Sequence, residues 1–232
     1  MHTSPRPTVQ LDPVLVIIDG SPTDLAVVEW AAREATQTSR PMAIVLAAGH
    51  LPPDLTYAER DAVRRQRLDD GRQVAAAAAE WAIKSAPGLC IGISVRLLPA
   101  DLLLPAVAEQ AHMMARSSAC WSHSDACCPE APVLVGHPRS APSLDLIHDA
   151  ADYARRQGVD LVVLEDDADT LAKRLVEQSG DTSALILSRP ARSGGSTLTW
   201  PLVLVTCTRS RSPVVLVAPA SRSVVAPGSS RA

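Results

Sequence analysis

An internal repeat is the feature of this sequence that most constrains its fold. Residues 13–45 align without a gap on residues 132–164, at an offset of 119 positions, and nine of the 33 aligned residues are identical. Both copies open with the letters PVLV, but only the first continues into Asp19 and Gly20, where the second has Pro138 and Arg139. Two copies of one opening predict two related folding units.

The order of patterns within each copy predicts a strand, a helix and a second strand. The runs at 13–19 and 132–137 are apolar up to their last residues, Asp19 and His137, which is typical of a strand buried on both faces of a parallel sheet. In the first copy Ser21 stands as a helix cap, followed by proline and by Asp24 in the first turn. Leu25, Val28, Ala32 and Ala35, matched by Leu144, Ile147, Ala151 and Ala154, are then expected to form the inner faces of two helices.

A second match shows that the two copies differ in length. Residues 100–110 resemble residues 168–178 at an offset of only 68, so the offset falls by 51. The second copy therefore lacks a counterpart of roughly 47–97, which in the first copy predicts a polar loop, a long helix ending near Ala86 and a strand at 90–98. Strands are expected at 183–188 and 212–219 in the second copy, but only the polar stretch 117–131 precedes the second opening.

These patterns predict an α/β protein with an open parallel sheet flanked by helices, in two repeated halves of which the second is shortened. Two incomplete sheets are expected to pack or pair into one body. The expected divisions are a flexible N-terminus, a first half, a cysteine-containing linker, a second half and a flexible tail, at 1–12, 13–119, 120–131, 132–219 and 220–232.

Composition narrows the classes of function. The formal net charge of −3 lacks the positive footprint of nucleic-acid binders, so no nucleic-acid partner is expected. No apolar run of membrane-spanning length occurs, and the first residues lack the apolar centre of a signal peptide. We therefore expect a cytoplasmic protein that does not bind membranes.

The segment VLVIIDGSPTDLAVVEWAAREA, at residues 14–35, resembles the opening strand, Asp-Gly-Ser turn and first helix of the universal stress proteins of the UspA type. Weaker similarity comes from ARRQGVDLVVLE, ALILSRP and the closing SPVVLVAP. The chain is thus similar to a degenerate tandem form of that family. The resemblance implies a Rossmann-like parallel sheet and a regulatory protein of the stress response, without a catalytic step.

The resemblance also implies ATP as the one candidate cofactor, because some members of the family bind it. In those members the aspartate after the first strand contacts the nucleoside, and a motif G-x-x-G-x9-G-[S/T] after the fourth strand holds the phosphates. Asp19 and Gly20 match the first element, whereas the segment after residue 188 has Gly194, Gly195 and Ser196 without the spacing. Phosphates are held by successive backbone N–H groups, so the altered spacing predicts weak or lost ATP binding.

A nucleotide-responsive alternative stays open. Asp19 could form the centre of an ATP- or AMP-binding switch in the crevice at the end of its strand. A composite site of Asp19 and the 188–196 loop would need both in one crevice, which two separate sheets disfavour.

The cysteines suggest a third function, a redox or metal sensor. Cys120, His123, Cys127 and Cys128 cluster within nine residues and offer the soft ligands that zinc prefers. Their spacing is not that of a usual zinc module, so no metal site is predicted and a linker with free thiols is the simpler interpretation. Cys90 and Cys207 lie in strand-like apolar runs and are expected to be buried fillers.

No catalytic residues are predicted. Asp19, Asp24 and His50 could converge at one edge of the sheet, but no further partner for acid–base chemistry is identifiable. The charged helix around 58–72 is expected to be a solvated face, with docking of a partner protein as the alternative. As partners we expect self-association, or pairing of the two halves through 212–219, and a protein that the sequence does not identify.

Overall fold

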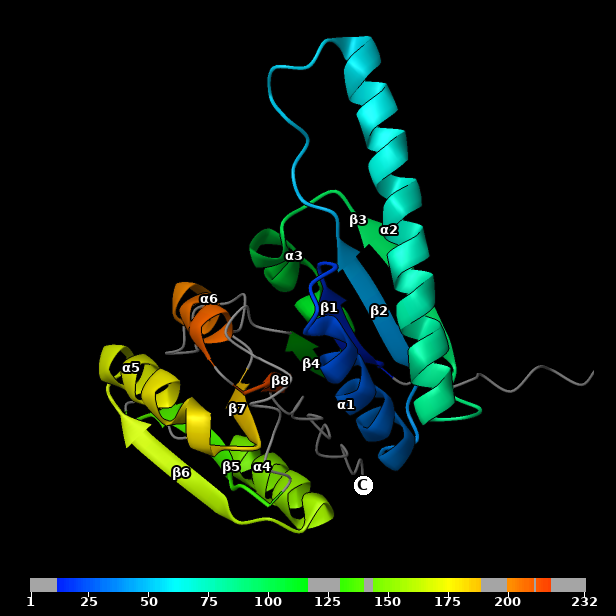
Figure 1. The fold of residues 1–232 in the computed structure, drawn as a ribbon. Helices are drawn as coiled ribbons and strands as arrows, with labels where there is room; N and C mark the ends of the chain where they lie inside the picture. Colours follow the sequence, from blue (N-terminus) through cyan, green and yellow to red (C-terminus); the bar gives the residue numbers. More distant parts are fainter. Residues whose placement is uncertain (1–11, 117–129, 140–143, 189–199, 211, 218–232) are drawn as a thin grey trace, which may run out of the picture.

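The computed structural model describes residues 12–116, 130–139, 144–188, 200–210 and 212–217 (Figure 1). Its centre is one eight-stranded sheet in the order β3-β2-β1-β4-β8-β7-β5-β6. The strands are β1 (Val14–Ile18), β2 (Met42–Ala47), β3 (Ile91–Arg96), β4 (Met113–Arg116), β5 (Val133–Pro138), β6 (Leu161–Asp166), β7 (Ala184–Ser188) and β8 (Val214–Val217).

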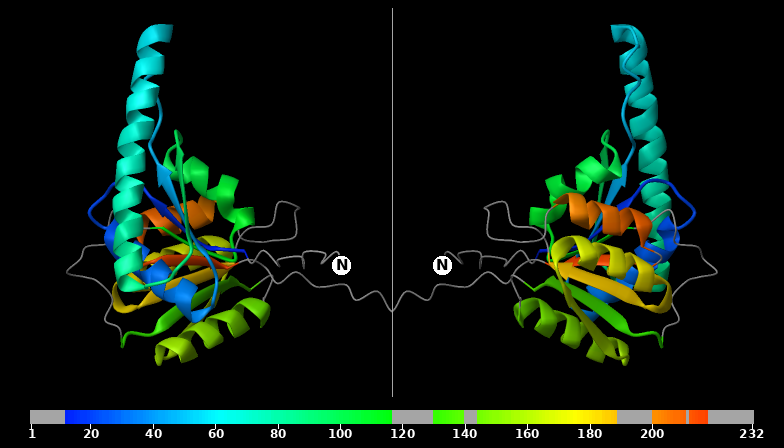
Figure 2. Two further views of the ribbon diagram at one scale, coloured as in Figure 1. Left: turned by 90° about the vertical axis from the view of Figure 1, so that its right-hand side faces the viewer. Right: turned by 90° about the vertical axis from the view of Figure 1, so that its left-hand side faces the viewer.

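Six α-helices cover the two faces of this sheet, as the edge-on views in Figure 2 show. They are α1 (Asp24–Gln37), α2 (Tyr57–Ser85), α3 (Ala100–Val107), α4 (Leu144–Gln157), α5 (Ala168–Gln178) and α6 (Trp200–Arg209). Side chains of α1, α2 and α4 join one core cluster, and those of α3, α5 and α6 join the other. Short 3-10 turns, Ala108–Gln110 and Ser179–Asp181, follow α3 and α5 at matching places in the two halves.

The two openings form matching central strands. All five residues of β1 and all six of β5 are buried, as expected for apolar strands covered on both faces. The register repeats as well, because Val14 pairs with Met42 and Val133 pairs with Leu161. The predicted strand–helix–strand order of both copies is therefore confirmed.

The two halves share a single sheet, so the separate sheets assumed for them were wrong, and the halves pair through β8, which lies within the segment 212–219 that was expected to join them. Strand β4 pairs with β8 in antiparallel fashion, with Met113 opposite Val217 and Arg116 opposite Val214, while every other strand pair of the described sheet is parallel. Strand β4 was not predicted from the sequence, because its four residues, MMAR, carry no β-branched side chain and end in a charge. This missed strand is the one that joins the halves.

A direct contact between α1 and α4 supports the junction; we call it the α1–α4 seam. The indole Nε1 of Trp30 donates a hydrogen bond of 2.6 Å to the Tyr153 hydroxyl. Arg156 forms a 2.5 Å ion pair with the buried Glu34 and stands 5.7 Å from the centre of the Tyr153 ring. These side chains hold the two halves together on one face of the sheet.

The predicted inner face of α1 is confirmed beyond its first turn, where Val28, Ala32 and Ala35 are buried, and that of α4 in part, with Ala154 buried and Ile147 and Ala151 half-buried. Leu25 and Leu144, expected on the inner faces, are 38% and 69% exposed, and the burial starts instead at Val27 and Leu146. Both leucines lie at the first turn of their helices, where the chain has not yet turned onto the sheet. The segment at α6 is also a helix, although its run of Val and Leu had suggested only a strand-like segment.

Helix α2 is longer than the sheet that it covers and extends well beyond it in Figure 1. Its start is fixed by a capping box, in which the Thr56 hydroxyl accepts from the Glu59 N–H and Glu59 accepts from the Thr56 N–H. At the middle of the helix Gly71 lets the backbone approach the sheet, since a Cβ there would lie 2.8 Å from Val95 Cγ1. Residues 57–66 beyond this contact are mostly exposed, which agrees with the predicted solvated face.

Candidate functional site

The carboxyl end of β1 is where the sheet topology predicts a ligand crevice. Strand β1 lies between β2 on one side and β4 on the other, so the chain changes direction across the sheet between β1 and β4. Open α/β sheets bind ligands at such a switch point, outside the carboxyl ends of the strands. Asp19 and Gly20 follow β1 directly at this place, as the sequence predicted.

The turn after β1 is held by its own side chains. The Asp24 carboxylate, 4% exposed, accepts hydrogen bonds from the N–H of Asp19 at 3.1 Å and of Gly20 at 2.7 Å. Asp19 Oδ1 accepts from the Ser21 N–H at 3.1 Å, and Gly20 has the positive φ of +89° that favours glycine. The two backbone donors that an anion would require therefore already bind Asp24.

This arrangement corrects the predicted helix cap. Ser21 does not cap α1, whose N-cap residue is Thr23 and makes no side-chain capping bond. The Ser21 hydroxyl instead donates to Asp24 Oδ1 at 3.2 Å. From the sequence, Asp24 was expected as a favourable charge in the first turn and as a residue that could converge with Asp19 and His50, but its spacing does not reveal that the turn folds back onto its carboxylate.

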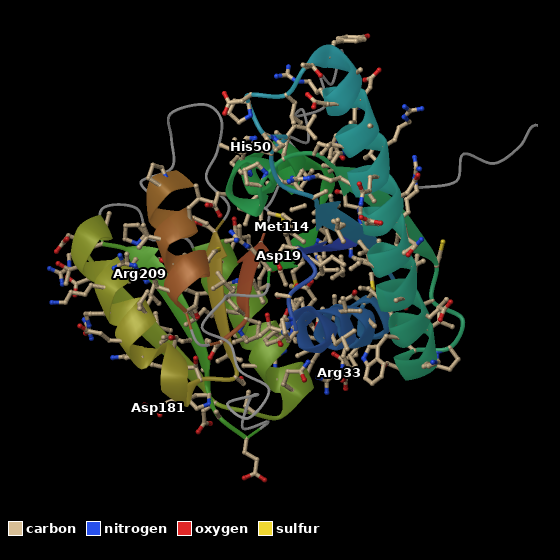
Figure 3. The ribbon with its side chains drawn as sticks, turned by 45° about the horizontal axis from the view of Figure 1, so that its top comes forward. Asp19, Arg33, His50, Met114, Asp181 and Arg209 are labelled. Carbon is tan, nitrogen blue, oxygen red and sulfur yellow. The ribbon has the colours of Figure 1, made fainter. Side chains whose placement is uncertain are left out.

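The other side of the switch point is occupied by an ion pair. Arg116 ends β4, and its Nη1 lies 2.6 Å from Oδ1 of Asp101 in the first turn of α3. The Asp101 carboxylate therefore neutralises the charge of the Arg116 guanidinium at this edge of the sheet. Figure 3 shows His50 above the same edge as Asp19, but no hydrogen bond or ion pair joins the two within the described segments. The His50 carbonyl instead accepts from Arg67 of α2 at 2.6 Å.

The corresponding edge of the second half has different residues. Pro138 stands where Asp19 stands in the first copy, and the side chain of the following Arg139 makes an exposed, 3.8 Å ion pair with Glu165. His137 is buried, with its Nδ1 3.5 Å from the Pro138 carbonyl oxygen. Strand β7 ends here at Ser188, while Gly194, Gly195 and Ser196 lie outside the described residues.

Strands β1 and β7, which lead to the two parts of the implied nucleotide site, end at opposite edges of the sheet. Strand β4 is parallel to β1, β8 is antiparallel to β4, and β7 is parallel to β8. The carboxyl ends of β1 and β7 therefore point in opposite directions, separated by roughly 16 Å of strand length. A composite site was expected to fail because of two separate sheets, but the physical reason is the direction of the strands within one sheet.

The described residues consequently do not fit a nucleotide site of the implied kind. Asp19 keeps the position of the nucleoside contact, but the donors beside it bind Asp24 and the nearby cation binds Asp101. Ser188, where the phosphate loop would begin, faces the other edge. Asp19 belongs to the first half of the chain, whereas Gly194 and Gly195 belong to the second half.

The described cysteines differ from expectation in one case. Cys207 is buried in α6, and burial raises the pKa of its thiol to about 12, so it stays protonated and unreactive at neutral pH. Cys90 is exposed just before β3, contrary to the prediction of a buried filler. Within the described ranges no group of histidine, cysteine and acidic residues could hold a metal ion, and the Cys120–Cys128 cluster lies outside them.

The fold and its switch point define an open α/β protein with a mostly parallel sheet. No protein-family model and no curated protein matches the sequence. None of the described helices combines the length and the apolar character needed to cross a membrane.

Solved structures show which α/β proteins the chain is similar to. A protein provisionally named a universal stress protein, from Pseudomonas aeruginosa UCBPP-PA14, superposes with a TM-score of 0.50 at 12% identity, over 90% of this chain and 94% of the other. A protein of unknown function, PA1789 from Pseudomonas aeruginosa PAO1, gives 0.50 at 12% identity over 90% and 93%. A universal stress protein from Archaeoglobus fulgidus DSM 4304 gives 0.49 at 10% identity over 90% and 97%. The chain has the universal stress protein fold, and the resemblance found at residues 14–35 is confirmed at that level.

Proposed function

We propose that this chain is a non-enzymatic regulatory protein of the universal stress protein kind, in which nucleotide binding is weak or lost. The observation that carries the proposal is the opposite direction of β1 and β7, which separates the aspartate from the strand end that leads to the glycines. In an open α/β sheet a ligand site needs its groups at one edge. Such a protein would act through its surface, as a partner of other proteins in the stress response.

The occupied donors at the Asp19 turn support the same proposal. A phosphate or carboxylate ligand would have to displace the Asp24 carboxylate from two backbone N–H groups. Asp24 is nearly fully buried, so its displacement would also break the start of α1. The cost of leaving these groups unpaired is about 1–3 kcal/mol for each lost bond.

Calorimetric titration of the full chain with magnesium–ATP and with AMP tests the proposal. We expect no saturable heat at millimolar nucleotide, and no release of phosphate from ATP on incubation. The same titrations on Asp19→Asn, with Asp54→Asn as an exposed control from the next loop, should reproduce the wild-type result. Saturable binding that Asp19→Asn abolishes and Asp54→Asn preserves would instead establish the alternative, a nucleotide switch at the Asp19 crevice.

A further inference from the structure

The two outer strands of the sheet, β3 and β6, are its open edges within the described chain. Strand β3 pairs only with β2, and β6 pairs only with β5. Each has six residues, so the two edges match in length. An open edge carries unpaired backbone N–H and C=O groups that can accept another strand.

The edge at β6 is apolar in its middle and acidic at its ends. Val162 and Val163 are 38% and 43% exposed, while the acidic side chains Asp160 and Glu165 stand on either side of them. Protected edges commonly carry a charge or a proline within the strand. The centre of β6 has neither, so this edge is suited to receive a strand with apolar residues.

The edge at β3 offers a complementary pattern. Ile93 is 47% exposed in its middle, and Arg96 is exposed at its end without an ion pair among the described side chains. Ile93 pairs in register with Ile44, and Val163 pairs with Val135. Ile44 and Val135 belong to the same core cluster, so Ile93 and Val163 lie on the same face of the sheet.

We propose that β6 of one molecule pairs with β3 of a second molecule in an antiparallel, head-to-tail association. With Ile93 opposite Val163, the register brings Val95 opposite Leu161 and Arg96 opposite Asp160. Apolar side chains thus meet in the middle of the interface, and opposite charges meet at its end. Since β6 runs antiparallel to β3 within one molecule, both copies keep the same orientation and their sheets continue one another.

Charge favours this pairing over the association of like edges. Two β6 strands with Val163 opposite Val163 would bring Asp160 of each molecule opposite Asp166 of the other, which is repulsive. Two β3 strands with Ile93 opposite Ile93 would offer Arg96 no acidic partner. The β6–β3 contact alone combines the apolar pair with an ion pair, and as a heterologous contact it forms open chains.

Reversal of the two charges tests the proposal on the full chain. For the wild type, light scattering and sedimentation should show a mass that rises with concentration beyond a dimer. Arg96→Asp alone and Asp160→Arg alone should each lose this rise. An equimolar mixture of the two variants should regain it, since each then offers the other a complementary edge, and the double variant should regain it as well.

The same measurements show which results would overturn the proposal. A wild type that stays monomeric at every concentration would reject the proposed self-association through β6 and β3. Association of the Asp160→Arg variant alone would reject the proposed pairing, because β3–β3 contacts, or β6–β6 contacts in which the new arginine faces Asp166, would then account for it. A mixture that fails to associate would reject the charge pair. Far-ultraviolet circular dichroism and the melting temperature of each variant should equal those of the wild type, because both side chains are exposed.

Discussion

Strands β2 and β6 hold the same place in the two copies of the repeat but have opposite surroundings. Ile44 of β2 is 0% exposed, whereas Val163, its counterpart at the offset of 119, is 43% exposed. Helix α2 and strand β3 lie beside β2, and the second copy has no counterpart of that segment. The loss of one segment therefore changes an inner strand into an edge strand without changing its pairing to the central strand.

The side chains at matched positions of β2 and β6 differ in polarity, in keeping with this difference in burial. Leu46 of β2 is 4% exposed, and the same repeat position in β6 is the exposed Glu165. A carboxylate is tolerated there because the Glu165 side chain is exposed to solvent. The repeat therefore preserves the backbone pairing of the strand, whereas the neighbouring segments determine which side chains are buried on it.

The largest expected effect comes from truncating the two matched positions. Ile44→Ala should lower the free energy of unfolding by about 2–5 kcal/mol, because it leaves a cavity under α2. Val163→Ala should cost less than ~1 kcal/mol, since its side chain already contacts solvent. Chemical denaturation of both variants measures the difference, and equal losses would contradict the claim that only β2 is covered.

The α1–α4 seam predicts an intermediate effect. Tyr153→Phe removes the acceptor of the buried Trp30 N–H, and it should cost about 1–3 kcal/mol because a buried donor loses its partner. Tyr57→Phe is the matched control: Tyr57 is 84% exposed, and its substitution should change little. If the two substitutions had equal effects on thermal unfolding, the seam would not stabilise the junction of the halves.

The same comparison explains what the sequence could and could not predict. The repeat located β1, β2, β5 and β6, because buried parallel strands have continuous apolar runs whose order recurs. It also located Asp19 at the end of β1 and the shortening of the second half. Local patterns of this kind depend only on neighbouring residues.

The missing parts of the prediction depend on contacts that no pattern in the sequence indicates. The joining strand β4 is short and lacks a strand-like composition, and its antiparallel partner β8 lies about a hundred residues further along the chain. The direction of β7 relative to β1 follows only from that pairing, so the sequence could not show that Asp19 and Ser188 lie at opposite edges of the sheet. Likewise, no local pattern indicates that the Asp24 carboxylate takes the backbone donors of the turn.

The smallest effect concerns a repeat position that holds a carboxylate in one half and a phenol in the other, Glu34 and Tyr153. Burial raises the pKa of Glu34, although the ion pair with Arg156 acts in the opposite direction, and none of the described residues gives its Oε2 a hydrogen bond. Glu34→Gln should change the stability at neutral pH by about 1 kcal/mol or less, because removing the charge also removes its burial cost.

The pH dependence gives this last prediction its sign. A carboxyl group whose pKa is higher in the folded state binds more protons when folded, so its contribution is fully present below the ordinary value of 4.5 and declines as the pH rises through the raised value. Wild-type stability relative to Glu34→Gln should therefore fall as the pH increases from about 4 towards neutrality. Glu80→Gln, on the exposed face of α2, should show no such trend. A difference that stays constant with pH, or rises, would mean that the ion pair with Arg156 outweighs burial at the seam.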